Sequence, residues 1–293
     1  MAKEKILILG ATGMIGNTIF RVLSQNKKFD VLGTSRENTK KDLISGIYIE
    51  NIDSIIRVIA ETKPTIVLNC VGLIKQMPNA DDLATATYMN SLFPHRLAHL
   101  LSISNIRMVH FSTDCVFSGE KGNYLEPDLA DATDIYGKTK YLGEVINYKN
   151  CLTIRTSCIG HELQEYCGLV EWFLTQKTSV WGFKKAIYSG IPTVELAEIL
   201  SKIVIPNHKL NGLYQISAEP ISKYDLLNLI AKEYNKKIDI KVATVNQEKT
   251  TVDRSLNSTK FRKKTGYNPQ SWPDLIKKMH QDYKSNPIYR KYR

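Results

Sequence analysis

The opening of the chain joins a hydrophobic stretch to a turn that contains three glycines at a fixed spacing. The apolar stretch is Ile6-Leu7-Ile8-Leu9, and Gly10, Gly13 and Gly16 follow the pattern G-x-x-G-x-x-G. Apolar side chains then recur at helical spacing over 15–23. A buried strand that turns sharply into a helix aims backbone N–H groups and the positive end of the helix dipole at one point, and this arrangement binds a pyrophosphate. The opening therefore predicts a dinucleotide-binding turn.

The glycine spacing differs from the G-x-G-x-x-G of the commonest dinucleotide fingerprint, so a tight connection without a ligand is the alternative. The position of the turn, between a strand and an amphipathic helix, favours the dinucleotide. We expect the residues of this turn to contact the cofactor: Gly10, Thr12, Gly13, Met14, Ile15 and Gly16.

Strand and helix patterns alternate through the first half of the chain. The strands are expected at 4–10, 30–35, 65–71, 106–112 and 151–156. The helices between them are expected at 14–26, 51–62, 82–103 and 136–148. This alternation predicts an α/β fold with a Rossmann-type, doubly wound parallel sheet.

The pattern loosens beyond residue 156, where a smaller C-terminal α/β substrate-binding domain is expected. Its segments are about 157–189 and 218–293, whereas 1–156 and about 190–217 form the NAD(P)-binding domain; 293 residues suffice for both. Helices are expected at 166–176, 193–204, 222–234 and 272–284, and short strands near 186–189, 212–217 and 238–242.

Composition and charge exclude several classes of protein. No apolar run reaches the ~18–20 residues that cross a bilayer, and the chain enters its first strand at once, so we expect a cytoplasmic protein without a membrane partner. The net charge is +11, and it concentrates in residues 254–293. Because no nucleic-acid motif accompanies this charge, we prefer a solvated basic tail and small anionic ligands to a nucleic-acid partner. The five cysteines lack disulfide or metal-ligand spacing, so no metal is expected.

Two polar groups of residues carry the expected chemistry. Tyr136 and Lys140 are four residues apart, which on a helix places both side chains on one face. A neighbouring ammonium favours the phenolate, so such a tyrosine can pass a proton to a carbonyl oxygen as hydride reaches the carbon. Thr113 ends the strand near 106–112, where its hydroxyl could orient the same oxygen; a turn that satisfies its own backbone is the alternative.

In this order, the glycine turn, Ser112-Thr113-Asp114 and Tyr136-x-x-x-Lys140 resemble the extended short-chain dehydrogenase/reductase family, and most of all its dTDP-4-dehydrorhamnose reductase group. The resemblance spans nearly the whole chain, because Glu126-Pro127, 254–258 and Trp272 also match that group. Cys115 departs from it, since an aromatic residue is usual there.

The resemblance implies hydride transfer from a nicotinamide cofactor to the 4-keto group of a nucleotide-linked 4-keto-6-deoxy sugar, in the synthesis of cell-surface polysaccharide precursors. Thr113, Tyr136 and Lys140 would be catalytic, with Tyr136 as proton donor. Some relatives act on UDP-linked amino sugars instead of dTDP-linked hexoses, and 70–76 and 158–163 look more like those. The expected substrate contacts are Thr113, Asp114, Cys115, Lys75 and Arg254. The further expected cofactor contacts are Asn69, Cys70, Val71, Asn90, Tyr136, Lys140 and Ser157.

The residues after the second strand bear on the choice of coenzyme. NAD-binding chains usually place an acidic residue there, whereas this chain has Ser35 and Arg36. These side chains can donate hydrogen bonds to a 2′-phosphate, so NADP(H) is favoured over NAD(H).

Three alternatives remain at this point. A 4,6-dehydratase or an epimerase shares the fold, but the glutamate expected of a dehydratase after Asp114 is replaced by Cys115. A non-catalytic NADP-binding regulatory protein is the third, although such relatives tend to lose the tyrosine or the lysine. A homodimer is a further expectation that the sequence leaves open.

Overall fold

The computed structural model describes residues 3–37, 42–77, 79–163, 168–244 and 251–289. The chain packs as two compact units. The first unit comprises residues 1–113, 133–154 and 197–213, and the second comprises 114–132, 155–196 and 214–293.

Segment 114–132 groups with the second unit, whereas the sequence analysis counts it with the cofactor domain. The reason is its backbone pairing: the N–H of Tyr124 donates to the carbonyl of Ser255 over 2.9 Å, and the N–H of Asn257 donates to the carbonyl of Tyr124 over 2.8 Å.

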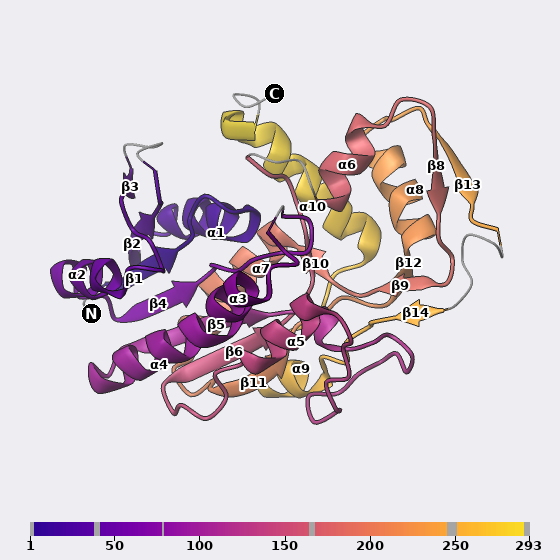
Figure 1. The fold of residues 1–293 in the computed structure, drawn as a ribbon. Helices are drawn as coiled ribbons and strands as arrows, with labels where there is room; N and C mark the ends of the chain where they lie inside the picture. The colour runs from indigo at the N-terminus through magenta and orange to yellow at the C-terminus, as the bar shows by residue number, and fades with distance from the viewer. Residues whose placement is uncertain (1–2, 38–41, 78, 164–167, 245–250, 290–293) are drawn as a thin grey trace. The chain divides into compact units, whose positions relative to one another are not determined.

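A seven-stranded sheet carries the fold (Figure 1). Its strands, in spatial order, are β11 (Gly212–Gln215), β6 (Cys151–Arg155), β5 (Arg107–Ser112), β4 (Ile66–Asn69), β1 (Glu4–Leu9), β2 (Phe29–Thr34) and β3 (Leu43–Ile44). The pairs β1–β2, β2–β3, β1–β4 and β4–β5 are all parallel. β1 lies between β2 and β4, so the order of strands reverses there, and ligands collect at such a point. The predicted doubly wound fold is confirmed, and β3 is an addition that the sequence analysis did not foresee.

The first unit also contains helices and π-helical turns. They are α1 (Met14–Ser24), α2 (Ile52–Thr62), α3 (Leu83–Thr87), α4 (Phe93–Ile103) and α5 (Ile135–Leu142), with π-helical turns η1 (Tyr88–Leu92) and η3 (Leu200–Val204). One buried cluster joins Leu7 and Val67 of the sheet to Ile55 of α2 and Leu97 of α4. These two helices therefore cover the same face, because alternate strand residues point to one side.

Helix α5 ends at Leu142, so the expected continuation to residue 148 is wrong. Gly143 caps the helix, and its N–H donates to the carbonyl of Thr139 over 3.1 Å. A Cβ at Gly143 would lie 1.8 Å from the carbonyl oxygen of Asn90, so only glycine permits this close packing of α5 against η1.

The second unit combines helices with short strands. Its helices are α6 (Leu169–Thr175), α8 (Lys223–Glu233), α9 (Thr259–Thr265) and α10 (Trp272–Ser285), with 3-10 turns η2 (Asp114–Val116) and η4 (Pro287–Tyr289). Its strands are β7 (Cys158–Ile159), β8 (Ser179–Gly182), β9 (Ala186–Tyr188), β10 (Ile191–Pro192), β12 (Ile221–Ser222), β13 (Asp239–Val242) and β14 (Val252–Asp253). Helix α7 (Thr193–Ile199) runs from this unit into the first one. Part of the expected helix 166–176 lies outside the described residues, as does Cys167, one of the five cysteines.

Among the described residues, no helix is both long enough and apolar enough to cross a bilayer.

Candidate active site

The glycine turn follows β1 and has a shape that requires two of its three glycines. Gly10 adopts a φ of +78°, and a Cβ there would lie 3.1 Å from Cγ2 of Val71 and 3.3 Å from the carbonyl oxygen of Cys70. A Cβ at Gly16 would lie 2.1 Å from the carbonyl oxygen of Gly10. The turn is therefore closed tightly on itself and on the end of β4.

Gly13 differs from the other two glycines, because space is left around it. Among the described residues, the nearest heavy atom to a Cβ at Gly13 would be the carbonyl oxygen of Gly10, 3.7 Å away. Gly13 is the N-cap of α1 and offers no side chain to the helix N-terminus, and the first turn from Met14 contains no acidic residue. Thr12 and Gly13 are exposed, whereas Met14 and Ile15 are half-buried. An open helix N-terminus that receives no hydrogen bond from a capping side chain fits a pyrophosphate.

Ser35 and Arg36 follow β2 and differ in their surroundings. Ser35 is buried, and its hydroxyl donates to the carbonyl of Glu37 over 2.7 Å. Arg36 is exposed, so its guanidinium is the group of this pair that is accessible to a 2′-phosphate.

Two asparagines that we expect to contact the cofactor are hydrogen-bonded to other protein groups at their side-chain amides. Asn69 is bonded to Nδ1 of His110 over 3.1 Å and accepts from the N–H of Val71 over 3.2 Å, which joins the ends of β4 and β5. Asn90 accepts from the N–H of Leu73 over 2.9 Å and donates to the carbonyl of Leu73 over 3.0 Å. Its amide also donates to the hydroxyl of Thr139 over 3.3 Å, so the π-helical turn η1 joins the loop after β4 to α5.

The expected catalytic pair lies on α5. Asp134 is the N-cap of this helix, because its Oδ1 accepts from the N–H of Gly137 over 2.9 Å. Its Oδ2 pairs with Nζ of Lys75 over 2.8 Å, and that same Nζ lies 5.6 Å from the centre of the Tyr136 ring. Lys75, which we expected to contact substrate, therefore lies beside the phenol that we expect to donate the proton.

Lys140 is enclosed between α5, the end of β5 and the loop after β4. Its side chain is buried, and its Nζ donates to the carbonyl of Phe111 over 2.6 Å. Burial lowers the pKa of this ammonium to about 8, while the charges of Glu144 and Cys70 act in the opposite direction. A Cβ at Gly72 would lie 3.8 Å from this Nζ, so the loop passes close to it. Thr113 follows β5 directly and is also buried.

The structure adds a pair of residues that the sequence analysis did not select as site residues. The hydroxyl of Ser112 donates to Oε1 of Glu144 over 2.7 Å, and both side chains are buried. The signal for Glu144 was its spacing, since it stands four residues beyond Lys140. The pairing of Ser112 with Glu144 gave no sequence signal, because the two residues are 32 positions apart.

The remaining expected residues belong to the second unit. Asp114 is buried in η2, whereas Cys115 and Ser157 are half-buried. The carbonyl of Ser157 accepts from the N–H of Ile191 over 2.9 Å. Nε of Arg254 donates to the carbonyl of Phe117 over 2.9 Å, which ties Arg254 to the segment that follows η2.

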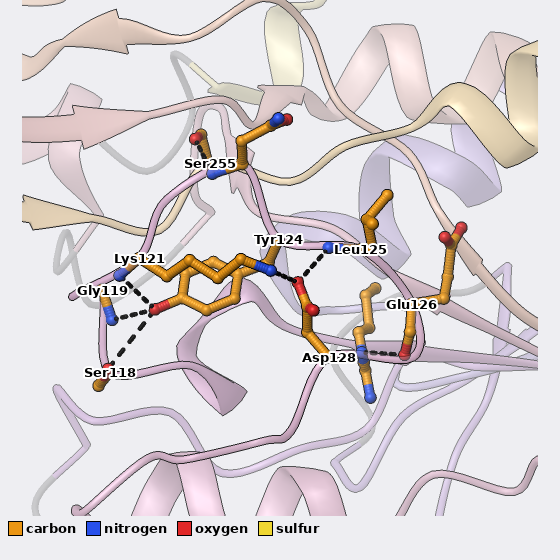
Figure 2. Close-up of polar contacts among 10 residues, drawn as sticks. Ser118, Gly119, Lys121, Tyr124, Leu125, Glu126, Asp128 and Ser255 are labelled. Atoms are coloured by element: carbon orange, nitrogen blue, oxygen red, sulfur yellow. Dashed lines mark hydrogen bonds and ion pairs between the residues drawn. The ribbon is translucent and has the colours of Figure 1, made fainter.

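That segment is built around Tyr124, as Figure 2 shows. The phenol oxygen of Tyr124 accepts from the N–H groups of Gly119 and Lys121, each over 3.1 Å. Its ring stacks on Phe117 with a centroid distance of 4.0 Å. These contacts fix the backbone downstream of Asp114 and Cys115. Over the described residues, no cluster of three metal-ligating side chains occurs.

A doubly wound sheet, a glycine turn after its first strand and a Tyr-x-x-x-Lys helix after β5 define a Rossmann-type protein of the short-chain dehydrogenase/reductase class. Within this class, the chain belongs to the family described as RmlD substrate binding domain, whose model matches residues 4–285. The family predicted from the sequence is confirmed.

Several known proteins are similar to the chain over most of its length. A dTDP-4-dehydrorhamnose reductase of Aggregatibacter actinomycetemcomitans is 26% identical, with 93% of this chain and 97% of that protein covered. The spore coat polysaccharide biosynthesis protein SpsK of Bacillus subtilis is also 26% identical, with 96% and 98% covered. Methionine adenosyltransferase 2 subunit beta of Danio rerio is 23% identical, with 79% and 74% covered.

Among solved structures, a dTDP-4-dehydrorhamnose reductase from Bacillus anthracis in complex with NADP matches with a TM-score of 0.82. It is 20% identical, and 96% of this chain and 99% of that chain are covered. This likeness confirms the fold.

Proposed function

We propose that the chain is an NADPH-dependent reductase of the 4-keto group of a nucleotide-linked 4-keto-6-deoxy sugar, acting in the synthesis of polysaccharide precursors. The observation that carries the proposal is α5, on which Tyr136 is followed one turn later by Lys140, buried against the end of β5. The names of the reductase and polysaccharide relatives support the same reaction.

The site residues divide the chemistry among themselves. Bound coenzyme supplies the hydride. The phenol of Tyr136 donates its proton to the carbonyl oxygen of the sugar, and the hydroxyl of Thr113 donates a hydrogen bond that orients this oxygen. Positive charge beside a phenol favours the form that remains after proton transfer, and Lys140 and Lys75 supply that charge on α5 and on the loop after β4.

The preference for NADPH follows from the residues after β2. Arg36 is exposed there and can form a charge-assisted hydrogen bond with a 2′-phosphate. The turn at Gly13 leaves room for the pyrophosphate of the same coenzyme. The complex of the Bacillus anthracis reductase with NADP supports this choice.

The test offers the purified protein dTDP- and UDP-linked 4-keto-6-deoxy sugars with NADPH or NADH and follows the absorbance of the reduced nicotinamide. We expect consumption of NADPH with one of the two sugar classes. Tyr136→Phe should lower kcat by ~10²–10⁴-fold while NADPH affinity stays unchanged, because the phenol ring remains and only the proton donor is lost. A protein that binds NADPH but oxidises none of it with either sugar class would contradict the proposal.

A second candidate is a non-catalytic subunit of another enzyme, which the likeness to methionine adenosyltransferase 2 subunit beta favours. The presence of both Tyr136 and Lys140 argues for the reductase. The Tyr136→Phe variant separates the two, because a subunit would keep its effect on its partner. A cytoplasmic location and a homodimer remain predictions of the sequence.

A further inference from the structure

The buried surroundings of Lys140 disfavour its protonated, charged form. The residue is 6% exposed, and its Nζ donates to the carbonyl of Phe111. Two titratable groups act on its charge, Glu144 beyond its own helix and Cys70 after β4, and Lys140 acts in turn on His110 of β5. Burial holds the pKa of His110 well below its usual range, so this ring is neutral at physiological pH and contributes no balancing charge.

Glu144 is the carboxylate of this set, and it is held in place. It is 6% exposed, and its Oε1 accepts from the hydroxyl of Ser112 over 2.7 Å. Its N–H donates to the carbonyl of Tyr141 over 3.1 Å, so the backbone is fixed where α5 ends. Both charged groups bond to consecutive residues at the end of β5, because Nζ of Lys140 donates to the carbonyl of Phe111 and Oε1 of Glu144 accepts from the hydroxyl of Ser112. A buried carboxylate that has neither a counter-charge nor a hydrogen bond costs several kcal/mol, whereas this one has a hydroxyl donor and shares the end of β5 with an ammonium.

We infer that Glu144 is a positioning residue of the reductase site, whose carboxylate keeps Lys140 protonated and, through Ser112, fixes the end of β5 from which Thr113 follows. The inference rests on the proposed function, since it assigns the pair Lys140 and Glu144 a task in the reaction. Tyr136 and Lys140 lie one turn apart on α5, and Glu144 acts on Lys140 from the residue that follows the Gly143 cap.

The test measures the protonation of Lys140 directly. Protein labelled with ¹³C at the lysine Cε is titrated by NMR, and the Lys140 signal is identified by its absence from the spectrum of Lys140→Arg. Glu144→Gln keeps the shape of the side chain and removes its charge. We expect the titration midpoint to fall by about one pH unit, which reduces the protonated fraction at the original midpoint from one half to about one tenth. The alkaline limb of the kcat/KM profile should move to lower pH with it.

Two further variants separate charge from packing. Glu144→Asp retains the carboxylate, so its titration midpoint should fall by no more than about half as much as the midpoint of Glu144→Gln. Ser112→Ala retains the charge of Glu144 but removes the bond to β5, so kcat should fall while the midpoint moves less than in Glu144→Gln. A folded Glu144→Gln protein with the midpoint of the unmodified protein would overturn the inference.

Should Glu144→Gln fail to fold, the double variant Lys140→Met with Glu144→Gln decides the matter. Removal of both charges leaves no uncompensated ammonium, so the double variant should be more stable than the single one. A double variant that is no more stable would overturn the inference. Failure of the proposed function looks different: the NMR midpoint would shift as expected, while no sugar is reduced.

Discussion

Gly13 and Gly16 of the turn should respond differently to the addition of one methyl group, and this difference separates folding from ligand binding. In Gly16→Ala, the new Cβ would lie 2.1 Å from the carbonyl oxygen of Gly10, whereas contacts below 3.0 Å are essentially never seen. The turn must therefore open by about 0.9 Å or more. Overpacking of this kind costs ~1–3 kcal/mol.

Gly13→Ala meets no such obstacle within the described part of the chain, where the nearest atom is 3.7 Å from the new Cβ. Its φ of −73° suits alanine, and the gain from a less flexible unfolded chain, ~0.4–1 kcal/mol, offsets the weaker N-cap. The methyl group would nevertheless stand where the backbone has to approach a pyrophosphate. Stability should therefore stay nearly constant while coenzyme affinity falls.

The assay pairs thermal unfolding with titration of NADPH by its fluorescence. Gly16→Ala should lower Tm by several degrees and raise the Kd for NADPH about 100-fold, which corresponds to ~2.7 kcal/mol. Gly13→Ala should leave Tm within about two degrees and raise the Kd at least about tenfold. If Gly13→Ala bound NADPH as tightly as the unmodified protein, the turn would be a connection without a ligand, and the reasoning would be refuted.

Two other changes test single features of the site. Arg36→Glu places a carboxylate where a 2′-phosphate would lie, so the ratio of kcat/KM for NADPH over NADH should fall by ~10-fold or more; an unchanged ratio would remove Arg36 from the coenzyme site. Asn90→Ala leaves the N–H and carbonyl of Leu73 unbonded in a buried place, at ~1–3 kcal/mol, so Tm should drop by several degrees; a Tm within about one degree of the original would contradict this.

The fold could be predicted from the sequence wherever one element is long and periodic. The strand and helix that flank the glycine turn lie within two residues of their expected bounds at 4–9 and 14–24. The two-residue strands, such as β7 and β10, escaped prediction because they are too short for an alternating pattern. The end of α5 was missed because it depends on packing against η1.

The site could be predicted only in part, for a similar reason. The helical spacing of Tyr136 and Lys140 is a local property and is visible in the sequence. The hydrogen bonds between Ser112 and Glu144 and between Asn90 and Leu73 join residues that are far apart along the chain. Such pairs arise from tertiary contacts that residue spacing does not encode.

The wide turn η1 has a consequence for how the chain tolerates insertions and deletions. A π-helical turn contains one residue more than regular α-helix would need over the same rise. Loss of one residue within 88–92 would restore ordinary helix and swing the residues on one side of the deletion by about 100° about the axis. The Asn90 amide could then no longer form hydrogen bonds with Leu73 and Thr139 at the same time. Homologues of different length in this helix should therefore lack that amide bridge, whatever their overall likeness.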